Sequence, residues 1–131
     1  MYKTTFILGD ITENIVPHET FDCAIITLVL HTNNRKTIKR ILEEAKRMTK
    51  KNGFIIIADY GHGIHFKGKL AALFIRFIES FTNSSHRTHY FEFMRRGALH
   101  AILCEEKYQV LESLSFYDNA LNIRVVTLKD Y

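Results

Sequence analysis

The sequence predicts a single α/β domain built on a mostly parallel sheet. Two continuous apolar runs, 6–8 and 23–30, are rich in residues that favour strands. Continuous runs are typical of strands buried on both faces of a parallel sheet. A strand, a helix and a third strand then follow with short connections, which is the order of a βαβ unit. A chain of 131 residues is long enough for one domain with a core, so the predicted domain is 1–131.

The composition is that of an ordinary globular protein, with 47% apolar and 24% charged residues and a formal net charge of +4. The basic residues are spread along the chain, which is typical of solvated helix faces; a weak affinity for anionic substrates, RNA or membrane surfaces is the alternative. No specific nucleic-acid partner is predicted. Cys23 and Cys104 lack a paired metal spacing, and no signal peptide or membrane span is evident, so we expect a cytoplasmic protein with free thiols.

The first half of the chain predicts three strands and one helix. The first strand, Lys3–Leu8, is closed by Gly9-Asp10, and a connector occupies Ile11–Thr20. The second strand is Phe21–Leu30. A helix over Thr37–Thr49 has apolar residues at helical spacing, and we expect Gly53 to end it in a left-handed cap. The remaining strand is Phe54–Ala58, which stops at Asp59-Tyr60.

The second half predicts helices and then an antiparallel pair. The segment Lys69–Phe81 is an apolar helix, for which we weigh a core or dimer helix against a lid over an apolar substrate or a membrane contact. Two shorter helices, His89–Met94 and Ala98–Cys104, are split at Gly97. Extended segments at 108–114 and 115–121 precede a last strand, Ile123–Leu128, with a turn at 118–122 between the two closing strands.

Three stretches of this sequence carry a family resemblance. GDITENIVPHETFDCAIITLVLH (9–31) resembles the central motifs of class I S-adenosylmethionine-dependent methyltransferases, especially those similar to ubiquinone/menaquinone methyltransferases. TIKRILEEAKRMTKKNGFIIIADY (37–60) looks like the following helix, turn and strand of that family. HYFEFMRRGALHAIL (89–103) and RVVTL (124–128) look like its lid helix and closing strands. The turn at 49–53 departs from the family pattern, because it has one glycine and no proline.

The resemblance implies a Rossmann-like methyltransferase sheet with an antiparallel closing strand and a helical lid segment at 61–104. The family's first βαβ segment and its GxGxG loop would precede Lys3, so we expect a carboxyl part that lacks them. Gly61-His62-Gly63 is not a substitute, because it lies elsewhere. The loss leaves a sheet edge to be covered by a second copy, a partner chain or the apolar helix, so we expect a homodimer or a partner chain.

The resemblance also implies residues that bind the cofactor, S-adenosylmethionine. Asp10 would accept a hydrogen bond from the adenine amino group, and Ile11 would pair with the ring through its backbone N–H and pack on it. Thr27 would touch the methionine part of the cofactor, and Leu28 would line the same cleft. The structural alternatives are that Asp10 caps a turn and that Thr27 and Leu28 are ordinary strand residues.

Histidines and tyrosines are the candidates for the acceptor side of the site. His31, after the second strand, could assist a substrate proton, or it could be structural. A polar fringe on the substrate pocket is expected from Tyr60, His62, His86 and Tyr90. The spacings His62/His65 and His86/His89 could suit zinc, but no carboxylate or thiolate joins either pair in the sequence, so no metal is predicted.

Two functions from different classes follow from these observations. The first is an S-adenosylmethionine-dependent methyltransferase, or its carboxyl fragment, that acts on a small apolar acceptor. The second is a non-catalytic methyltransferase-like remnant that serves as an interaction or regulatory subunit. The methyl acceptor and its acceptor atom do not follow from the sequence.

Overall fold

A computed structural model describes residues 3–128, and at Leu128 the backbone alone. Four strands form one sheet in the order β1-β2-β4-β3. They are β1 (Phe21–Thr27), β2 (Thr49–Tyr60), β3 (Tyr108–Phe116) and β4 (Leu121–Leu128). β1 pairs with β2 in parallel, whereas β4 is antiparallel to both β2 and β3. The α/β class is therefore confirmed, with a smaller parallel part than the sequence predicts.

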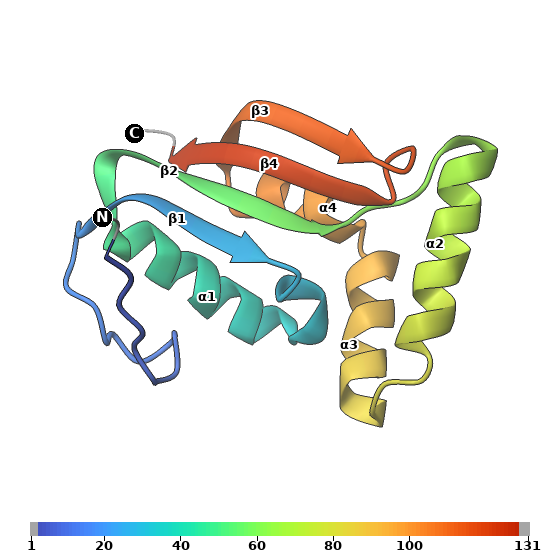
Figure 1. Cartoon of the computed structure of the whole chain (residues 1–131), viewed down its shortest axis with the longest axis horizontal. Coiled ribbons are helices and arrows are strands. Elements are labelled where there is room, and N and C mark those ends of the chain that lie inside the picture. Colours follow the sequence, from blue (N-terminus) through green and yellow to red (C-terminus); the bar gives the residue numbers. More distant parts are fainter. Residues whose placement is uncertain (1–2, 129–131) are drawn as a thin grey trace.

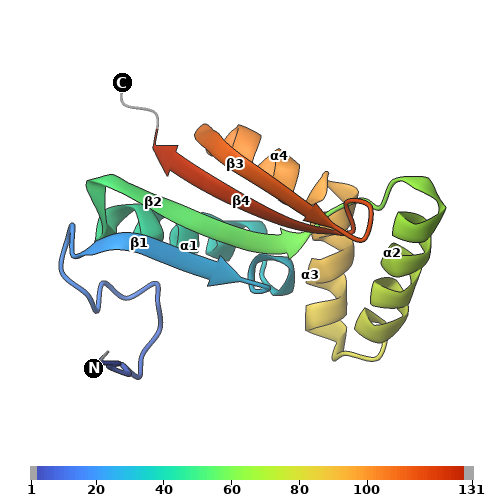
Figure 2. The ribbon, with the colours of Figure 1, turned by 45° about the horizontal axis from the view of Figure 1, so that its top comes forward.

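Four helices accompany the sheet: α1 (Arg35–Met48), α2 (His65–Glu79), α3 (Ser84–Arg95) and α4 (Ala98–Glu105). A short 3₁₀ turn, Leu30–Thr32, follows β1. Helices α1 and α4 lie along the sheet, and α2 and α3 stand side by side beyond the end of β2 (Figures 1 and 2). The predicted helical segment 61–104 is thus present as α2, α3 and α4. Its role as a lid stays a prediction.

The hydrophobic core lies on one face of the sheet, where α1 and α4 pack. Its fully buried side chains include Leu30, Leu42, Ile55, Ile57, Leu99 and Val126. Residues that point to the other face remain exposed, such as Ile25 of β1 and Phe54 of β2. The prediction that the strands are buried on both faces of the sheet is therefore wrong for residues 3–128, because the helices that pack against the sheet there are all on one side.

Helix α1 follows the sequence prediction closely. Asn34 is its N-cap, and its side chain accepts a hydrogen bond from the Thr37 backbone N–H. The apolar residues predicted at helical spacing are all buried: Ile38, Ile41, Leu42, Ala45 and Met48. The prediction that Gly53 ends the helix in a left-handed cap is wrong, because Thr49 ends the helix in an extended conformation and β2 begins there. Gly53 instead permits a close approach, since a Cβ there would lie 2.7 Å from the Asp22 carbonyl oxygen.

The first predicted strand does not form. Residues 3–8 are irregular, and Phe6 and Leu8 are almost fully exposed. A strand needs a neighbour for its backbone groups, and none of the described strands pairs with this segment. The second strand is shorter than predicted, because β1 ends at Thr27 and Leu28 adopts a left-handed conformation with φ of 51°.

The second half matches the predicted element types, except that residues 117–120 of the predicted extended segment 115–121 form a turn. Gly97, with φ of 106°, separates α3 from α4, and β3 and β4 close the sheet through the turn at 117–120. Helix α2 begins earlier than predicted, and its apolar side chains, such as Leu73 and Phe77, are exposed. It is therefore not a core helix of this chain, and it does not run along the free edge of β1 (Figure 1). None of the helices in residues 3–128 is long and apolar enough to cross a membrane.

Candidate functional site

A polar cluster lies where the parallel strands β1 and β2 end. Asp59 is the next-to-last residue of β2, and the alternation of the strand puts it on the same side as the buried Ile55 and Ile57. His31 lies in the 3₁₀ turn that follows β1. Both side chains are almost completely buried. In open α/β sheets, ligands bind at the carboxyl ends of the strands, so this is where a site is expected.

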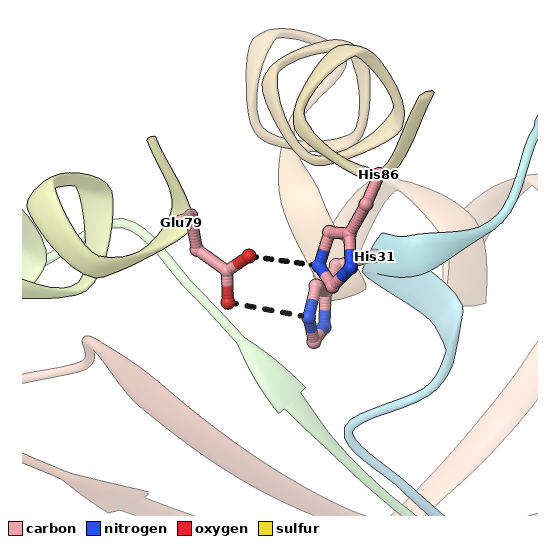
Figure 3. Close-up of side chains that lie close together, drawn as sticks. All are labelled: His31, Glu79 and His86. Carbon is pink, nitrogen blue, oxygen red and sulfur yellow. Dashed lines mark ion pairs between the residues drawn. The ribbon is translucent and has the colours of Figure 1, made fainter. Parts of the chain in front are cut away.

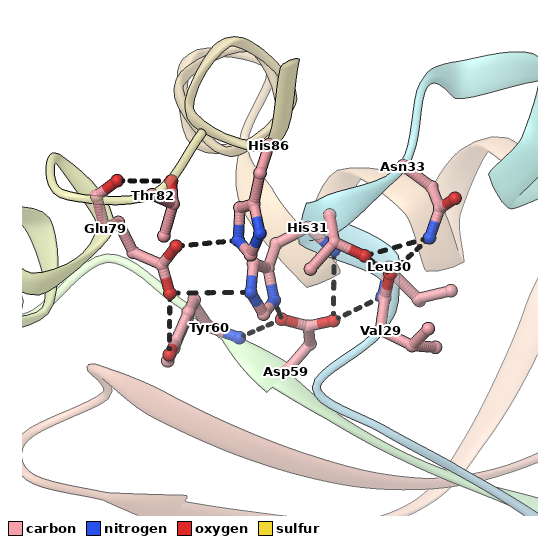
Figure 4. A network of polar contacts seen from close by, with 10 residues as sticks. Val29, Leu30, His31, Asn33, Asp59, Tyr60, Glu79, Thr82 and His86 are labelled. Atoms are coloured by element: carbon pink, nitrogen blue, oxygen red, sulfur yellow. Dashed lines mark hydrogen bonds and ion pairs between the residues drawn. The ribbon is translucent and has the colours of Figure 1, made fainter. Parts of the chain in front are cut away.

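Asp59 holds the turn after β1 in place. Its Oδ2 accepts the backbone N–H groups of Leu30 (2.9 Å) and His31 (3.3 Å), and its Oδ1 accepts the Tyr60 N–H (2.8 Å) (Figure 4). The same Oδ1 lies 2.7 Å from Nδ1 of His31. Since a carboxylate only accepts hydrogen bonds, Nδ1 of His31 carries the proton in this pair. The ring is thus fixed with Nε2 pointing away from Asp59.

Glu79 and His86 approach this ring from the helical segment. Oε1 of Glu79, at the end of α2, lies 3.6 Å from Nε2 of His31, and Oε2 lies 2.8 Å from Nε2 of His86 in α3 (Figure 3). Glu79 is the one acidic residue of α2, and its side chain is buried. The three side chains therefore join the sheet edge to α2 and α3. We call His31, Glu79 and His86 the histidine–glutamate cluster.

Two tyrosines surround the cluster. The Tyr60 hydroxyl donates to Oε1 of Glu79 at 3.3 Å, and its ring centroid lies 4.5 Å from that of His31. Burial, followed by the nearby Glu79 carboxylate, raises the pKa of Tyr60 to about 12, so its hydroxyl stays a donor at neutral pH. Tyr90 packs edge-on against both His31 and Tyr60, and burial together with Glu79 raises its pKa as well.

A hollow of about 340 Å³ opens between α2 and α3 beside the cluster. Its lining combines apolar side chains, such as Leu73, Phe91 and Met94, with polar and basic ones: His62, Lys69, Arg76 and Tyr90. Tyr90 therefore reaches both the hollow and His31. Tyr90 would therefore connect a small molecule in this hollow to the histidine–glutamate cluster.

The structure brings some of the predicted site residues together and leaves others apart. His31, Tyr60, His86 and Tyr90 meet at the cluster, and His62 lines the adjacent hollow. Thr27 and Leu28 lie just before the 3₁₀ turn, and the Leu28 N–H donates to the Ala58 carbonyl.

Asp10 and Ile11 lie in the connector, away from the other predicted site residues. Asp10 is exposed, and its carboxylate accepts the backbone N–H and the hydroxyl of Thr12, which is the turn-capping arrangement. These hydrogen bonds hold the pKa of Asp10 below its usual value. The connector is tied to α1 through Arg40 and Arg47, which donate to carbonyls of the connector. No hydrogen bond in residues 3–128 joins Asp10 to Thr27 or Leu28.

Sequence reasoning missed Asp59 and Glu79 as site residues. The expectation that no carboxylate joins either histidine pair is wrong for His86, because Glu79 contacts it. The available signals were the acidic residue at the end of a buried strand and the single carboxylate in the apolar helix α2. The pair partners His65 and His89 do not join the cluster; Nδ1 of His89 instead lies 3.0 Å from the Thr32 carbonyl oxygen.

Comparisons with known proteins agree with this architecture. A family model described as a methyltransferase domain matches residues 2–57, which is less than half of the chain. Among solved structures, TnmH superposes with a TM-score of 0.65 over 94% of this chain at 14% identity. The mitomycin 7-O-methyltransferase MmcR matches with a TM-score of 0.58 over 91% of the chain at 20% identity. CalO1, a methyltransferase in calicheamicin biosynthesis in its SAH-bound form, has a TM-score of 0.59 over 92% at 17% identity.

This chain has a methyltransferase fold. At these identities the likeness concerns the fold alone. The chain spans about a third of each of these three proteins: 34% of TnmH, 32% of MmcR and 33% of CalO1. No curated protein matches the sequence. Within the methyltransferase fold, the histidine–glutamate cluster occupies the carboxyl ends of β1 and β2.

Proposed function

We propose that this chain takes part in S-adenosylmethionine-dependent transfer of a methyl group to a small, apolar acceptor. The observation that supports this most is the buried histidine–glutamate cluster at the carboxyl ends of parallel strands in a methyltransferase fold. In such a transfer, a lone pair of the acceptor forms a bond to the methyl carbon. The sulfur–methyl bond breaks, its electrons stay on sulfur, and S-adenosylhomocysteine leaves.

The acceptor side of the site is proposed to be the cluster and the hollow next to it. An acceptor atom that loses a proton during transfer would lie at the cluster, whose imidazoles and carboxylate can take that proton. Tyr60, His62, His86 and Tyr90 would surround the acceptor, and the apolar side chains that line the hollow favour an apolar body. Acceptors resembling those of ubiquinone/menaquinone methyltransferases are therefore the first to try.

The cofactor side is proposed to be Asp10, Ile11, Thr27 and Leu28, as the family resemblance implies. Leu28 supports this position, because it is partly exposed next to the turn that carries His31. Asp10 supports it through its exposed carboxylate, which leaves room for the adenine amino group.

Calorimetric titration of the 131-residue chain with S-adenosylmethionine tests this proposal. We expect micromolar binding, and we expect Asp10→Ala to weaken it about 10-fold or more, the usual cost of losing a hydrogen bond to a charged group. Asp22→Ala is the matched control, since Asp22 is also an exposed carboxylate but lies at the start of β1. Absence of binding up to millimolar cofactor would refute the proposal for this chain and favour an interaction or regulatory subunit.

We also propose that the chain works as a homodimer or with a partner chain. The exposed apolar side chains of α2 support this, as does the edge of β1, which pairs with no other strand within residues 3–128, because both kinds of surface are usually covered. Light scattering at micromolar concentration tests the homodimer, and the mass of a single chain would count against it.

A further inference from the structure

The histidine–glutamate cluster offers three ligand atoms of the kinds that hold zinc. One nitrogen each from His31 and His86 and one carboxylate oxygen of Glu79 all lie within 4.8 Å of one another. His31 and Glu79 are buried, and His86 is partly so. Two histidines and one glutamate form a known type of catalytic zinc site, in which the fourth position stays open for water or substrate.

The contact between Glu79 and His86 is short but is not a hydrogen bond. Oε2 of Glu79 and Nε2 of His86 form an ion pair at 2.8 Å, yet neither atom has a hydrogen-bond partner within residues 3–128. Buried polar atoms normally make a hydrogen bond, so both atoms are available as ligands of an ion. A nitrogen and an oxygen bound to one tetrahedral zinc ion lie about 3.3 Å apart, and each directs its lone pair at the ion rather than at the other ligand. Opening the contact by about half an ångström would admit the ion.

His31 is oriented as a metal ligand would be. Its Nδ1 faces Asp59 at 2.7 Å, so Nε2 is the ring nitrogen that faces Glu79, at 3.6 Å. That distance is too long for a hydrogen bond, and a zinc ion between the two atoms would bind both of them. Histidines that ligate metals almost always donate their other ring N–H to a carboxylate or carbonyl, which is what Asp59 provides here.

The two buried carboxylates give the same indication. Asp59 and Glu79 both lie against His31, and their two negative charges need compensation in a buried site. Within residues 3–128, the groups at ion-pair distance from these two carboxylates are the imidazoles of His31 and His86. One divalent ion would supply that compensation while both imidazoles stay neutral.

We propose that His31, Glu79 and His86 bind one Zn²⁺ ion, with Asp59 as the residue that positions His31. The sequence alone does not predict this site, because its three ligands come from separate segments of the chain. At the open position the ion would bind an acceptor hydroxyl and lower its pKa. With the ion bound, the ligand atoms of the cluster could not take the proton themselves, so it would pass to solvent, and the oxygen would attack the methyl carbon while the sulfur–methyl bond breaks. This role rests on the proposed methyl transfer, whereas binding of the ion does not.

The test measures zinc binding without any reaction. The full chain is stripped with a chelator and titrated with Zn²⁺ in a calorimeter, and the visible absorption of bound Co²⁺ reports tetrahedral geometry. We expect one equivalent to bind with Kd at or below about 1 µM. Loss of an outer partner of a metal ligand already costs about 10–100-fold in affinity, so His86→Ala and Glu79→Gln should each cost about 100-fold or more. His86 is part-exposed, which favours a folded His86→Ala variant, and circular dichroism checks this.

The matched control is His100→Ala. His100 and Cys104 lie one turn apart on the exposed face of α4, with Nε2 and Sγ 3.7 Å apart, and they could hold zinc at the surface. This variant should leave zinc affinity unchanged. Binding that is lost in His100→Ala but kept in His86→Ala, or no binding at micromolar zinc, would overturn the inference. Binding of zinc at the cluster without binding of S-adenosylmethionine would instead refute the proposed function and leave the metal site standing.

Discussion

Replacing Asp59 by asparagine should destabilise the protein strongly, although the two side chains have nearly the same shape. Asp59 is fully buried and receives four donors, two at each carboxylate oxygen. Asparagine has only one accepting oxygen, so in either orientation its NH₂ group faces two donors. Each buried donor left without a partner costs about 1–3 kcal/mol, so with two such donors the variant should lose about 2–6 kcal/mol of the free energy of unfolding.

Urea denaturation at pH 7 in the presence of a chelator measures this loss. With an m-value of about 1.5 kcal/mol per M, the midpoint should fall by roughly 1.3–4 M. Asp22→Asn is the matched control, because Asp22 is exposed and, within residues 3–128, the one ion pair of its carboxylate is with Lys50 at 2.8 Å. Its midpoint should hardly move. Equal midpoints for the two variants would refute the reasoning that Asp59 holds the turn after β1.

Three further predictions concern the core, a helix cap and alkaline pH. Ile57→Ala should cost about 2–5 kcal/mol in the same urea assay, because Ile57 is fully buried, whereas Ile25→Ala should cost far less, since Ile25 is 68% exposed. Asn34→Ala should cost about 1 kcal/mol of the free energy of unfolding, because the cap of α1 is lost. The urea midpoint followed by helical circular dichroism should therefore fall, and an unchanged midpoint would argue against the cap. Burial, followed by Glu106, raises the pKa of Tyr108 above its unfolded value of about 10, so the stability it contributes is full below pH 10 and is lost as pH rises above it. Tyr108→Phe should therefore lose less stability between pH 9 and 11 than the wild type does, and parallel curves would contradict this.

Local patterns were sufficient to predict most of the elements. Helix α1 was predictable because its cap, its apolar spacing and its basic last turn all agree. The break at Gly97 was predictable because glycine accepts the positive φ that the chain adopts there. The irregular conformation of residues 3–8 was not predictable, since the pattern of a strand does not reveal whether a neighbouring strand is available to pair with it. The prediction that β1 is buried on both faces failed for a related reason, because a continuous apolar run does not reveal whether helices cover both faces.

The candidate site was predictable only in part. His31 and Tyr60 follow or end predicted strands, so the carboxyl-end rule finds them. Glu79 lies 48 residues after His31 and meets it only through the packing of α2 against α3. No spacing in the sequence encodes that contact. Asp59 was visible as the residue that ends a strand, but its function as the acceptor for the turn after β1 depends on the register between β1 and β2.

The way in which α2 is attached has a consequence for local motion. The apolar side chains of α2 are mostly exposed, and its buried residues are Gly68 and Glu79. Polar contacts of Glu79 at the last turn therefore hold α2 in place, whereas a buried apolar face holds α1. Elements with few buried apolar contacts open at lower free energy than the global transition, and their amides exchange with solvent faster. Deuterium uptake should therefore be rapid in α2 and slow in α1. An ion or ligand bound at the histidine–glutamate cluster would slow deuterium uptake in α2 first, because the cluster joins the last turn of α2 to α3 and to the turn after β1.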